Sequence, residues 1–232
     1  MNFLLTNEHL ESQISQIKRL IRLSMNGVVA DSMRNHGLIY KQNYGVAIPR
    51  IREIASGYTK NHDLAQRLWL LNIRETMILA TLLQPVEKFP IEHANEWLKK
   101  CDNIELVEQM NLNLYRHLDY APDFSLQCIA SDNELSKIFG YTLAMRVVEN
   151  LTTSNLQEMT KIAIQDAGTA TYQLSKAIAN FFARLCRKDE ATARELFSEI
   201  QAFNEHATNG KNLIYESVKH ELIFLGFLDE NL

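Results

Sequence analysis

The sequence is short of the residues that make tight turns, with 8 Gly and 4 Pro among 232 residues. A β-sandwich or β-barrel needs a turn after every short strand, so this scarcity disfavours both architectures. Long helices need fewer turns, and a chain that is 46% hydrophobic and 22% charged has enough apolar surface to pack them. We therefore expect a folded, helical protein with a large core.

Cysteines and long apolar runs are also scarce. The three cysteines, Cys101, Cys128 and Cys186, lie far apart in apolar stretches, which predicts buried free thiols in a reducing compartment. No CxxC pair or HxxxH spacing occurs, so we expect neither a metal site nor a cofactor. No apolar run approaches the roughly 20 residues that span a bilayer, and residues 1–8 lack the pattern of a signal peptide. A cytoplasmic protein without membrane contact is expected.

Common catalytic motifs are missing as well. The sequence contains no GxxxxGKS or GxxxxGKT loop, no GxGxxG loop, no GxSxG elbow and no HExxH pair. These absences exclude the usual nucleotide-phosphate loops, the α/β-hydrolase nucleophile and the common zinc protease site. The residue patterns by themselves therefore identify no active site.

The charge is unevenly distributed along the chain. The formal net charge is −4, which argues against a uniformly basic nucleic-acid-binding protein. Residues 1–60 nevertheless contain eight Lys or Arg and four Asp or Glu, a net of +4, and the remainder has a net charge of −8. This polarity is consistent with a cationic surface for phosphates near the N-terminus, and a chance imbalance is the alternative.

Apolar residues recur with the helical period along most of the chain. Pro49 is expected in a first helical turn, and Asp132, Ser154 and Asp189 at N-cap or first-turn positions. The predicted helices span residues 9–25, 28–36, 49–57, 63–71, 74–83, 90–100, 104–118, 123–130, 134–150, 155–166, 168–186, 189–206 and 210–225.

This spacing gives one helical pair in roughly 35 to 40 residues, the period of two-helix solenoid repeats. An all-α solenoid is therefore predicted, with a compact all-α bundle as the alternative. No low-complexity segment or long linker interrupts the chain, which predicts a single domain over residues 1–232.

Three segments in order resemble a known protein family. They are residues 44–55 (YGVAIPRIREIA), residues 68–80 with Leu68-Trp69 and Arg74-Glu75, and residues 97–108 with Trp97-Leu98 and the stretch DNIELVE. They are similar to successive helices and turns of the HEAT-like-repeat DNA glycosylases, the bacterial alkylpurine DNA glycosylase family. The resemblance covers about residues 28–110 and continues more weakly to about residue 187.

The resemblance implies a right-handed α-solenoid of HEAT-like antiparallel helical pairs whose concave basic face binds duplex DNA. It also implies excision of alkylated purines, in which a carboxylate stabilises the sugar cation formed when the N-glycosidic bond breaks. The family's catalytic aspartate falls on Glu108, its preceding aromatic residue on Ile104, and a later tryptophan on Asn180. Glu108 is thus the candidate catalytic residue, and a helix carboxylate without catalytic role is the alternative.

Phosphate contacts are expected mainly from the basic N-terminal part of the chain. Arg146 lies two positions from the family's arginine, a rotation of about 200 degrees on a helix, so it does not replace that residue directly. An ordinary solvated surface is the alternative for the six cations between positions 19 and 52. The candidate DNA-binding residues are Arg19, Arg22, Arg34, Lys41, Arg50, Arg52, Arg146 and Lys176.

The working hypothesis is a divergent DNA alkylation repair protein that binds alkylated duplex DNA, with weak or lost hydrolysis of the N-glycosidic bond. Trp69 and Trp97 are expected in the core between helices, and a base-stacking role is the alternative. The alternative is a non-catalytic α-solenoid scaffold with a protein partner on its concave face.

Overall fold

The protein is described here by a computed structural model covering residues 8–205 and 208–229. Its internal contacts divide the chain into two compact units, Met1–Leu114 (unit 1) and Tyr115–Leu232 (unit 2), each with its own core. The expected single domain over residues 1–232 remains a prediction. Within the described ranges every regular element is a helix, as the scarcity of turn residues predicted.

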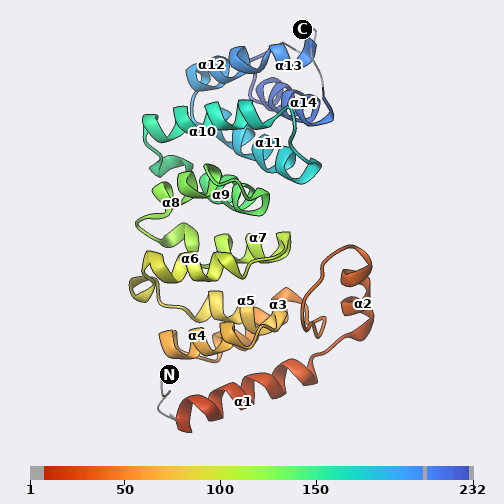
Figure 1. Cartoon of the computed structure of the whole chain (residues 1–232), viewed down its shortest axis with the longest axis vertical. Coiled ribbons are helices and arrows are strands. Elements are labelled where there is room, and N and C mark those ends of the chain that lie inside the picture. The colour runs from red at the N-terminus through yellow and green to blue at the C-terminus, as the bar shows by residue number, and fades with distance from the viewer. Residues whose placement is uncertain (1–7, 206–207, 230–232) are drawn as a thin grey trace. The chain divides into compact units, whose positions relative to one another are not determined.

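Unit 1 packs its helices around one central helix (Figure 1). The helices are α1 (Glu8–Leu23), α2 (Gly27–Asn35), α3 (Ile48–Ser56), α4 (His62–Leu70), α5 (Arg74–Leu83), the short 3-10 turn η1 (Val86–Lys88), α6 (Ile91–Lys99) and α7 (Ile104–Asn113). Helix α5 contacts α3, α4 and α7, and α1 contacts α3 and α4. Nine of the ten residues of α5 are buried, polar as well as apolar ones.

Both tryptophans belong to the core of unit 1, as expected. The rings of Trp69 and Trp97 are buried and stacked, with centroids 4.2 Å apart and planes 4° from parallel. Phe89 meets the Trp97 ring edge-on at 4.8 Å, and Trp97 Nε1 donates a hydrogen bond to the Gln66 side chain at 3.1 Å. Such a stack joins α4 to α6 and leaves neither indole face open to a ligand.

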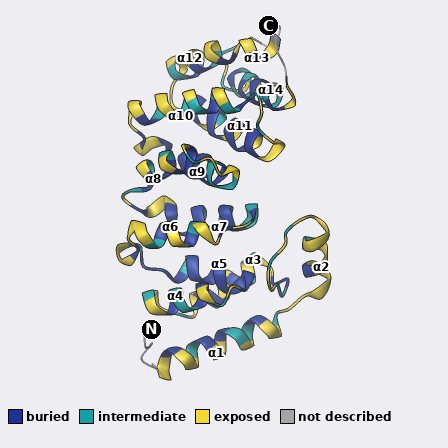
Figure 2. Ribbon diagram, in the orientation of Figure 1, coloured by how far each residue is buried: buried dark blue, intermediate teal, exposed yellow. Residues whose placement is uncertain are grey.

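Helix α2 contributes little to the core of unit 1. Only Ala30 of its nine residues is buried, and Figure 2 colours the helix almost entirely as exposed. Asn26 caps its first turn by accepting a hydrogen bond from Val29 N at 3.2 Å. The helix therefore holds its form by local bonds, with little help from core packing.

Unit 2 stacks helical pairs in two layers. Its elements are η2 (Tyr115–His117), α8 (Ala121–Ile129), α9 (Glu134–Arg146), η3 (Val148–Asn150), α10 (Thr153–Asp166), α11 (Tyr172–Cys186), α12 (Glu190–Ile200), α13 (Ala202–Glu205) and α14 (Asn209–Phe224). Helix α8 packs on its partner α9 and on α10, and α9 also packs on α11. Both helices of the α8–α9 pair thus contact the following pair, as in repeat proteins and unlike a single bundle.

The helix starts agree with the sequence in some places and differ in others. Pro49 lies in the first turn of α3, Ser154 in the first turn of α10, and Asp189 caps α12. The expectation for Asp132 is wrong, because the neighbouring Asn133 accepts the hydrogen bond from Ser136 N at 2.9 Å and caps α9. Two adjacent capping residues can compete for one helix start, and the sequence does not say which one wins.

The three cysteines are free and buried, as predicted. Burial raises the pKa of each thiol to about 12.

None of the helices in the described ranges is both long enough and apolar enough to span a bilayer.

Helices α8 and α9 approach each other closely at Gly140. A Cβ placed there would lie 2.7 Å from Ser125 O, 2.8 Å from Ile129 N and 2.7 Å from the Ile129 side chain. Two of these neighbours are backbone atoms, so the helices themselves would have to move apart.

We predict that Gly140→Ala lowers the free energy of unfolding by about 1 to 3 kcal/mol through this overpacking. Gly168→Ala is the matched control in the same unit, because its Cβ would meet only the end of the Lys211 side chain at 3.7 Å. Chemical denaturation of both variants measures the difference. Equal midpoints for the two would show that α8 and α9 do not approach as closely as described.

Candidate functional site

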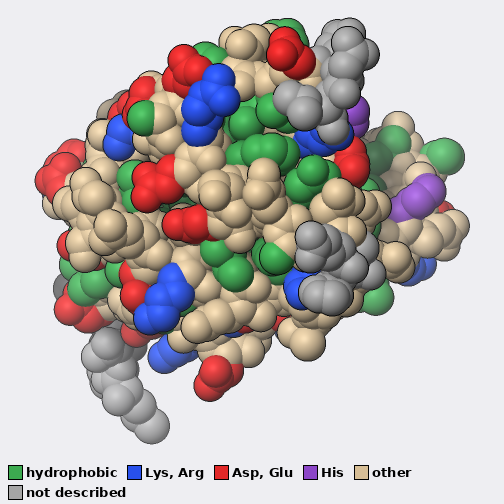
Figure 3. All heavy atoms as spheres, turned by 90° about the horizontal axis from the view of Figure 1, so that it is seen from above, with side chains coloured by type: hydrophobic (Ala, Val, Ile, Leu, Met, Phe, Trp, Pro, Cys, Tyr) green, Lys and Arg blue, Asp and Glu red, His purple; other side chains and the backbone are tan. Residues whose placement is uncertain are grey.

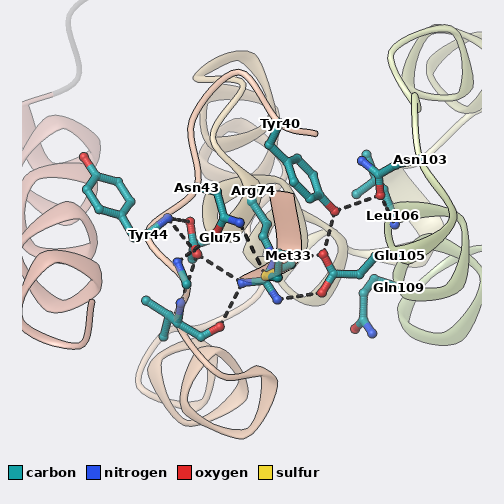
Figure 4. A network of polar contacts seen from close by, with 12 residues as sticks. Met33, Tyr40, Asn43, Tyr44, Arg74, Glu75, Asn103, Glu105, Leu106 and Gln109 are labelled. Carbon is teal, nitrogen blue, oxygen red and sulfur yellow. Dashed lines mark hydrogen bonds and ion pairs between the residues drawn. The ribbon is translucent and has the colours of Figure 1, made fainter. Parts of the chain in front are cut away.

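A buried polar network in unit 1 is centred on the guanidinium of Arg74, a residue at the start of α5 that is 3% exposed (Figure 4). Its Nε and Nη2 donate to the two carboxylate oxygens of Glu105 on α7, at 2.8 and 2.6 Å. Its Nη1 donates to Val46 O at 2.8 Å and to Glu75 Oε1 at 3.0 Å. The burial of Arg74 lowers its pKa, but the bonds to Glu105 and Glu75 outweigh this, so the pKa is raised and the charge is kept.

Glu75 uses its carboxylate to hold a backbone turn. The side chain is fully buried and accepts hydrogen bonds at 3.2 Å from the backbone N–H groups of Tyr44 and Val46. The backbone adds a further link, since Arg74 N donates to Gln42 O at 2.9 Å. The segment 42–46 is therefore tied to α5 at several points, unlike an ordinary surface loop.

Tyr40 extends the network toward α7. Its hydroxyl lies 2.7 Å from Glu105 Oε2 and 2.9 Å from Asn103 Oδ1, and its one proton can be donated to either acceptor. Burial, followed by the adjacent Glu105 charge, raises the pKa of Tyr40. The hydroxyl therefore stays protonated and serves as a donor to the carboxylate that neutralises Arg74.

The turn held by Glu75 fixes the connection between α1 and α2. Gly45 has a φ of 68°, and a Cβ there would lie 2.1 Å from Asn26 O and 2.8 Å from Ala30 N, so only glycine fits. Asn26 N donates to Tyr44 O at 2.8 Å. The start of α2 is thus locked onto the turn, and through Glu75 onto the buried network.

The six N-terminal candidate cations lie on α1, on α2, on the segment after α2 and on α3, all within unit 1. Arg50 is half-buried, and its Nε donates to Ser24 Oγ at 3.0 Å while Nη1 pairs with Glu53 at 2.7 Å. Arg34 pairs with Asp31 at 3.2 Å on the surface of α2. The other four are exposed and form no ion pair with another described residue: Arg19, Arg22, Lys41 and Arg52.

Arg34 and Lys41, seven residues apart, line the same small cavity. This cavity of about 240 Å³ lies between α2 and the segment 38–43, with Tyr40 and Asn43 also in its wall. Two cationic groups and polar side chains around one small hollow suit an anion the size of a phosphate.

The two candidates in unit 2 lie in a different electrostatic setting. Arg146 is half-buried at the end of α9, and Lys176 is exposed on α11. Unit 2 contains 11 Lys or Arg and 16 Asp or Glu, a net charge of −5. Acidic and basic side chains are interspersed over the α12 and α14 end in Figure 3, with no single-sign patch on that face.

Glu108, the candidate catalytic carboxylate, is half-buried on α7 in unit 1. It lies one turn after Glu105, the residue that neutralises Arg74. The sequence contains two tryptophans, and both are in the core stack, so neither can hold an alkylated base beside Glu108. The described residues also bring no three His, Cys, Asp or Glu side chains into an arrangement that could bind a metal ion.

Sequence reasoning missed Tyr40, Asn103 and Glu105 as members of the network. One signal was present: Arg74 and Glu75 are adjacent in the first turn of a predicted helix whose remaining residues carry no charge. If such a helix is buried, its charges must be paired internally. Their partners could not be inferred, because Tyr40 and Glu105 are 65 residues apart in the chain.

Comparison with known proteins identifies the relatives of this chain. A family described as DNA alkylation repair enzyme matches residues 17–213. A solved structure described as "a new family of proteins related to the HEAT-like repeat DNA glycosylases with affinity for branched DNA structures" is similar with a TM-score of 0.68 and 16% identity, covering 78% of this chain and 82% of that one. No curated protein matches the chain. The expected all-α fold of HEAT-like helical pairs is confirmed.

We predict that Glu75→Gln loosens the turn at residues 42–46, because an amide nitrogen would face N–H donors and Arg74 would keep only Glu105 as a counter-charge. The expected loss in the free energy of unfolding is about 3 kcal/mol. Hydrogen exchange of the Tyr44 and Val46 amides should accelerate.

The matched control is Glu53→Gln, which also removes a carboxylate paired with an arginine, but one whose side chain is 66% exposed. Its expected cost is below about 1 kcal/mol. Chemical denaturation and amide exchange compare the two variants, and a cost for Glu75→Gln no larger than that of Glu53→Gln would rule out the anchoring role.

Proposed function

Because the chain belongs to the DNA alkylation repair enzyme family, we propose that it binds DNA and that the basic surface of unit 1 makes the phosphate contacts. The observation that carries this proposal is the charge between residues 18 and 52, where seven Lys or Arg accompany one Asp. Four of these cations are exposed and have no carboxylate partner among the described residues. Unneutralised cations on a fixed surface are what a phosphate backbone requires.

The cavity between Arg34 and Lys41 supports a defined phosphate position within this surface. Asp31 competes for Arg34, but their ion pair is exposed, and exposed pairs contribute little. A phosphate can therefore replace Asp31 at small cost. Arg146 and Lys176 complete the proposed contacts as outlying cations of the acidic unit 2.

Alkylated duplex DNA is one proposed ligand, with Glu108 as the carboxylate that would stabilise the sugar cation in N-glycosidic hydrolysis. The buried tryptophans weaken this catalytic part, because no indole can hold the cationic base by cation-π contact. DNA binding does not depend on that contact. We propose binding as the principal activity and hydrolysis as weak or lost.

Branched DNA is a second ligand class, since affinity for branched DNA structures is stated for the similar solved protein.

We also propose the cytoplasmic location that was expected from the sequence, because three buried free thiols suit a reducing compartment.

The alternative is a protein-binding scaffold, and a groove in unit 2 favours it. The groove of about 500 Å³ runs beside α10 and α12 and has Leu156, Ile164 and Leu196 among its apolar lining residues. Lys161 and Glu195 line the same groove, and such a mixed surface suits a peptide better than a polyanion.

We predict salt-dependent DNA binding, in which the slope of log K against log salt becomes shallower by about 0.9 for each phosphate contact removed. Arg22→Gln and Arg52→Gln should each produce this change. Lys99→Gln on α6 removes the same charge from an exposed position of unit 1 outside the basic segment and should leave the slope unchanged. Fluorescence anisotropy with a labelled duplex measures all three. No binding at low salt, or equal slopes throughout, would refute the proposal.

For hydrolysis, we expect release of methylated purine from alkylated duplex DNA to be slow and to fall by about a hundredfold in Glu108→Gln, because a carboxylate placed at the developing cation contributes about that much. Glu96→Gln, an exposed carboxylate on α6, is the control. Chromatography of the released base gives the rate. Equal rates in wild type and Glu108→Gln would dismiss Glu108 as the catalytic residue.

A further inference from the structure

The corner between α1 and α2 exposes an unusual amount of apolar surface. Leu23, Met25 and Val28 are 73%, 64% and 81% exposed, and Val29 is 39% exposed. Of the nine large hydrophobic residues that are exposed among the described residues, these four fall within seven positions. Single exposed apolar side chains need no explanation, but a cluster marks a contact surface. We call residues 23–29 the apolar corner.

Contacts with Tyr44, Gly45 and Arg50 hold the backbone of the apolar corner in place. Asn26, at its centre, is bonded to Tyr44 O and packed against Gly45, and Ser24 accepts a hydrogen bond from Arg50. The turn that contains Tyr44 is in turn fixed by the buried carboxylate of Glu75. The exposed side chains are therefore presented on a fixed backbone, so a ligand would meet them with little ordering cost.

The charge around the apolar corner selects the kind of ligand. Arg22 precedes it directly, and Arg50, which is paired with Glu53, is bonded to Ser24. Asp31 is the only acidic residue between positions 18 and 52. A partner that combines negative charge with an apolar face suits this surface. An intact duplex offers the charge, but its base faces are stacked inside, whereas a branch point exposes base-pair faces between phosphates.

We propose that the apolar corner packs against exposed base faces at DNA branch points while the neighbouring arginines contact the flanking phosphates. This inference rests on the proposed DNA binding and adds the part of the surface that distinguishes branched from linear DNA. Phosphate contacts alone carry no such distinction, because both DNA forms present the same backbone.

The test compares a three-way junction with a linear duplex of the same total length, each with its helix ends closed by the same hairpin loop. Wild-type protein should prefer the junction by about tenfold, because aliphatic side chains that cover exposed base faces bury apolar surface that an intact duplex does not offer. The double variant Leu23→Ser/Val28→Ser should lose this preference and keep its affinity for the duplex within about twofold. Leu70→Ser is the control, because Leu70 is also exposed in unit 1, at 60%, but lies on α4.

A second readout uses a fluorescent adenine analogue at the branch point, whose emission rises when its base unstacks. Wild type and Leu70→Ser should raise the emission, and the double variant should not. Circular dichroism and thermal unfolding confirm that each variant is folded, and Val28→Ile, which keeps an apolar side chain, should retain the junction preference.

Several outcomes would overturn the inference. They are equal affinity of the wild type for both probes, a double variant that keeps the preference, or one that loses both affinities equally. Sedimentation showing that the wild type self-associates and the double variant does not would assign the apolar corner to a second copy of the chain. Absence of binding to either probe at low salt would instead refute the proposed function itself, so the two failures are distinguishable.

Discussion

The surface of unit 1 depends on one buried charge, the guanidinium of Arg74. A charge removed from water is tolerated only when carboxylates and hydrogen-bond acceptors surround it, and removing one of its partners is strongly destabilising. Here the acceptors come from three places: Glu105 on α7, Glu75 on α5, and the carbonyl of Val46 in the preceding segment. Because the guanidinium is planar and its N–H directions are fixed, these three places are held in one relative arrangement.

Hydrogen bonds connect this buried network to the exposed helix α2. Glu75 fixes the turn at Tyr44, the absence of a Cβ at Gly45 lets Asn26 approach, and Asn26 sets the start of α2. Helix α2 has almost no core contacts of its own, so without these bonds its position would be undefined. The position of α2 is thus fixed by a polar network, whereas the positions of the other helices of the unit are fixed by apolar packing.

The sequence predicted the helices well because helical periodicity is a local property. The bounds of α5 agree to the residue, whereas α11 begins at Tyr172 and not at Gly168, because the Thr171 side chain caps it four residues later than expected. The buried network was beyond prediction, since it joins residues up to 65 positions apart. The apolar corner was missed for another reason: the sequence pattern assigns apolar residues to the core by default, and only the structure shows Leu23 and Val28 in solvent.

The proposed DNA binding and the proposed hydrolysis depend on different residues, so a divergent member of this family can keep one activity without the other. The proposed phosphate contacts lie between positions 18 and 52 and depend on charge, which tolerates displacement by an ångström. Hydrolysis would depend on Glu108 and on an aromatic partner for the base, and its rate falls steeply with small errors in geometry. Trp69 and Trp97 are used by the core, and their stack stabilises α4 and α6 whether or not any base is bound. Because these indoles serve the core, neither the fold nor the proposed phosphate contacts require that the chain be catalytic.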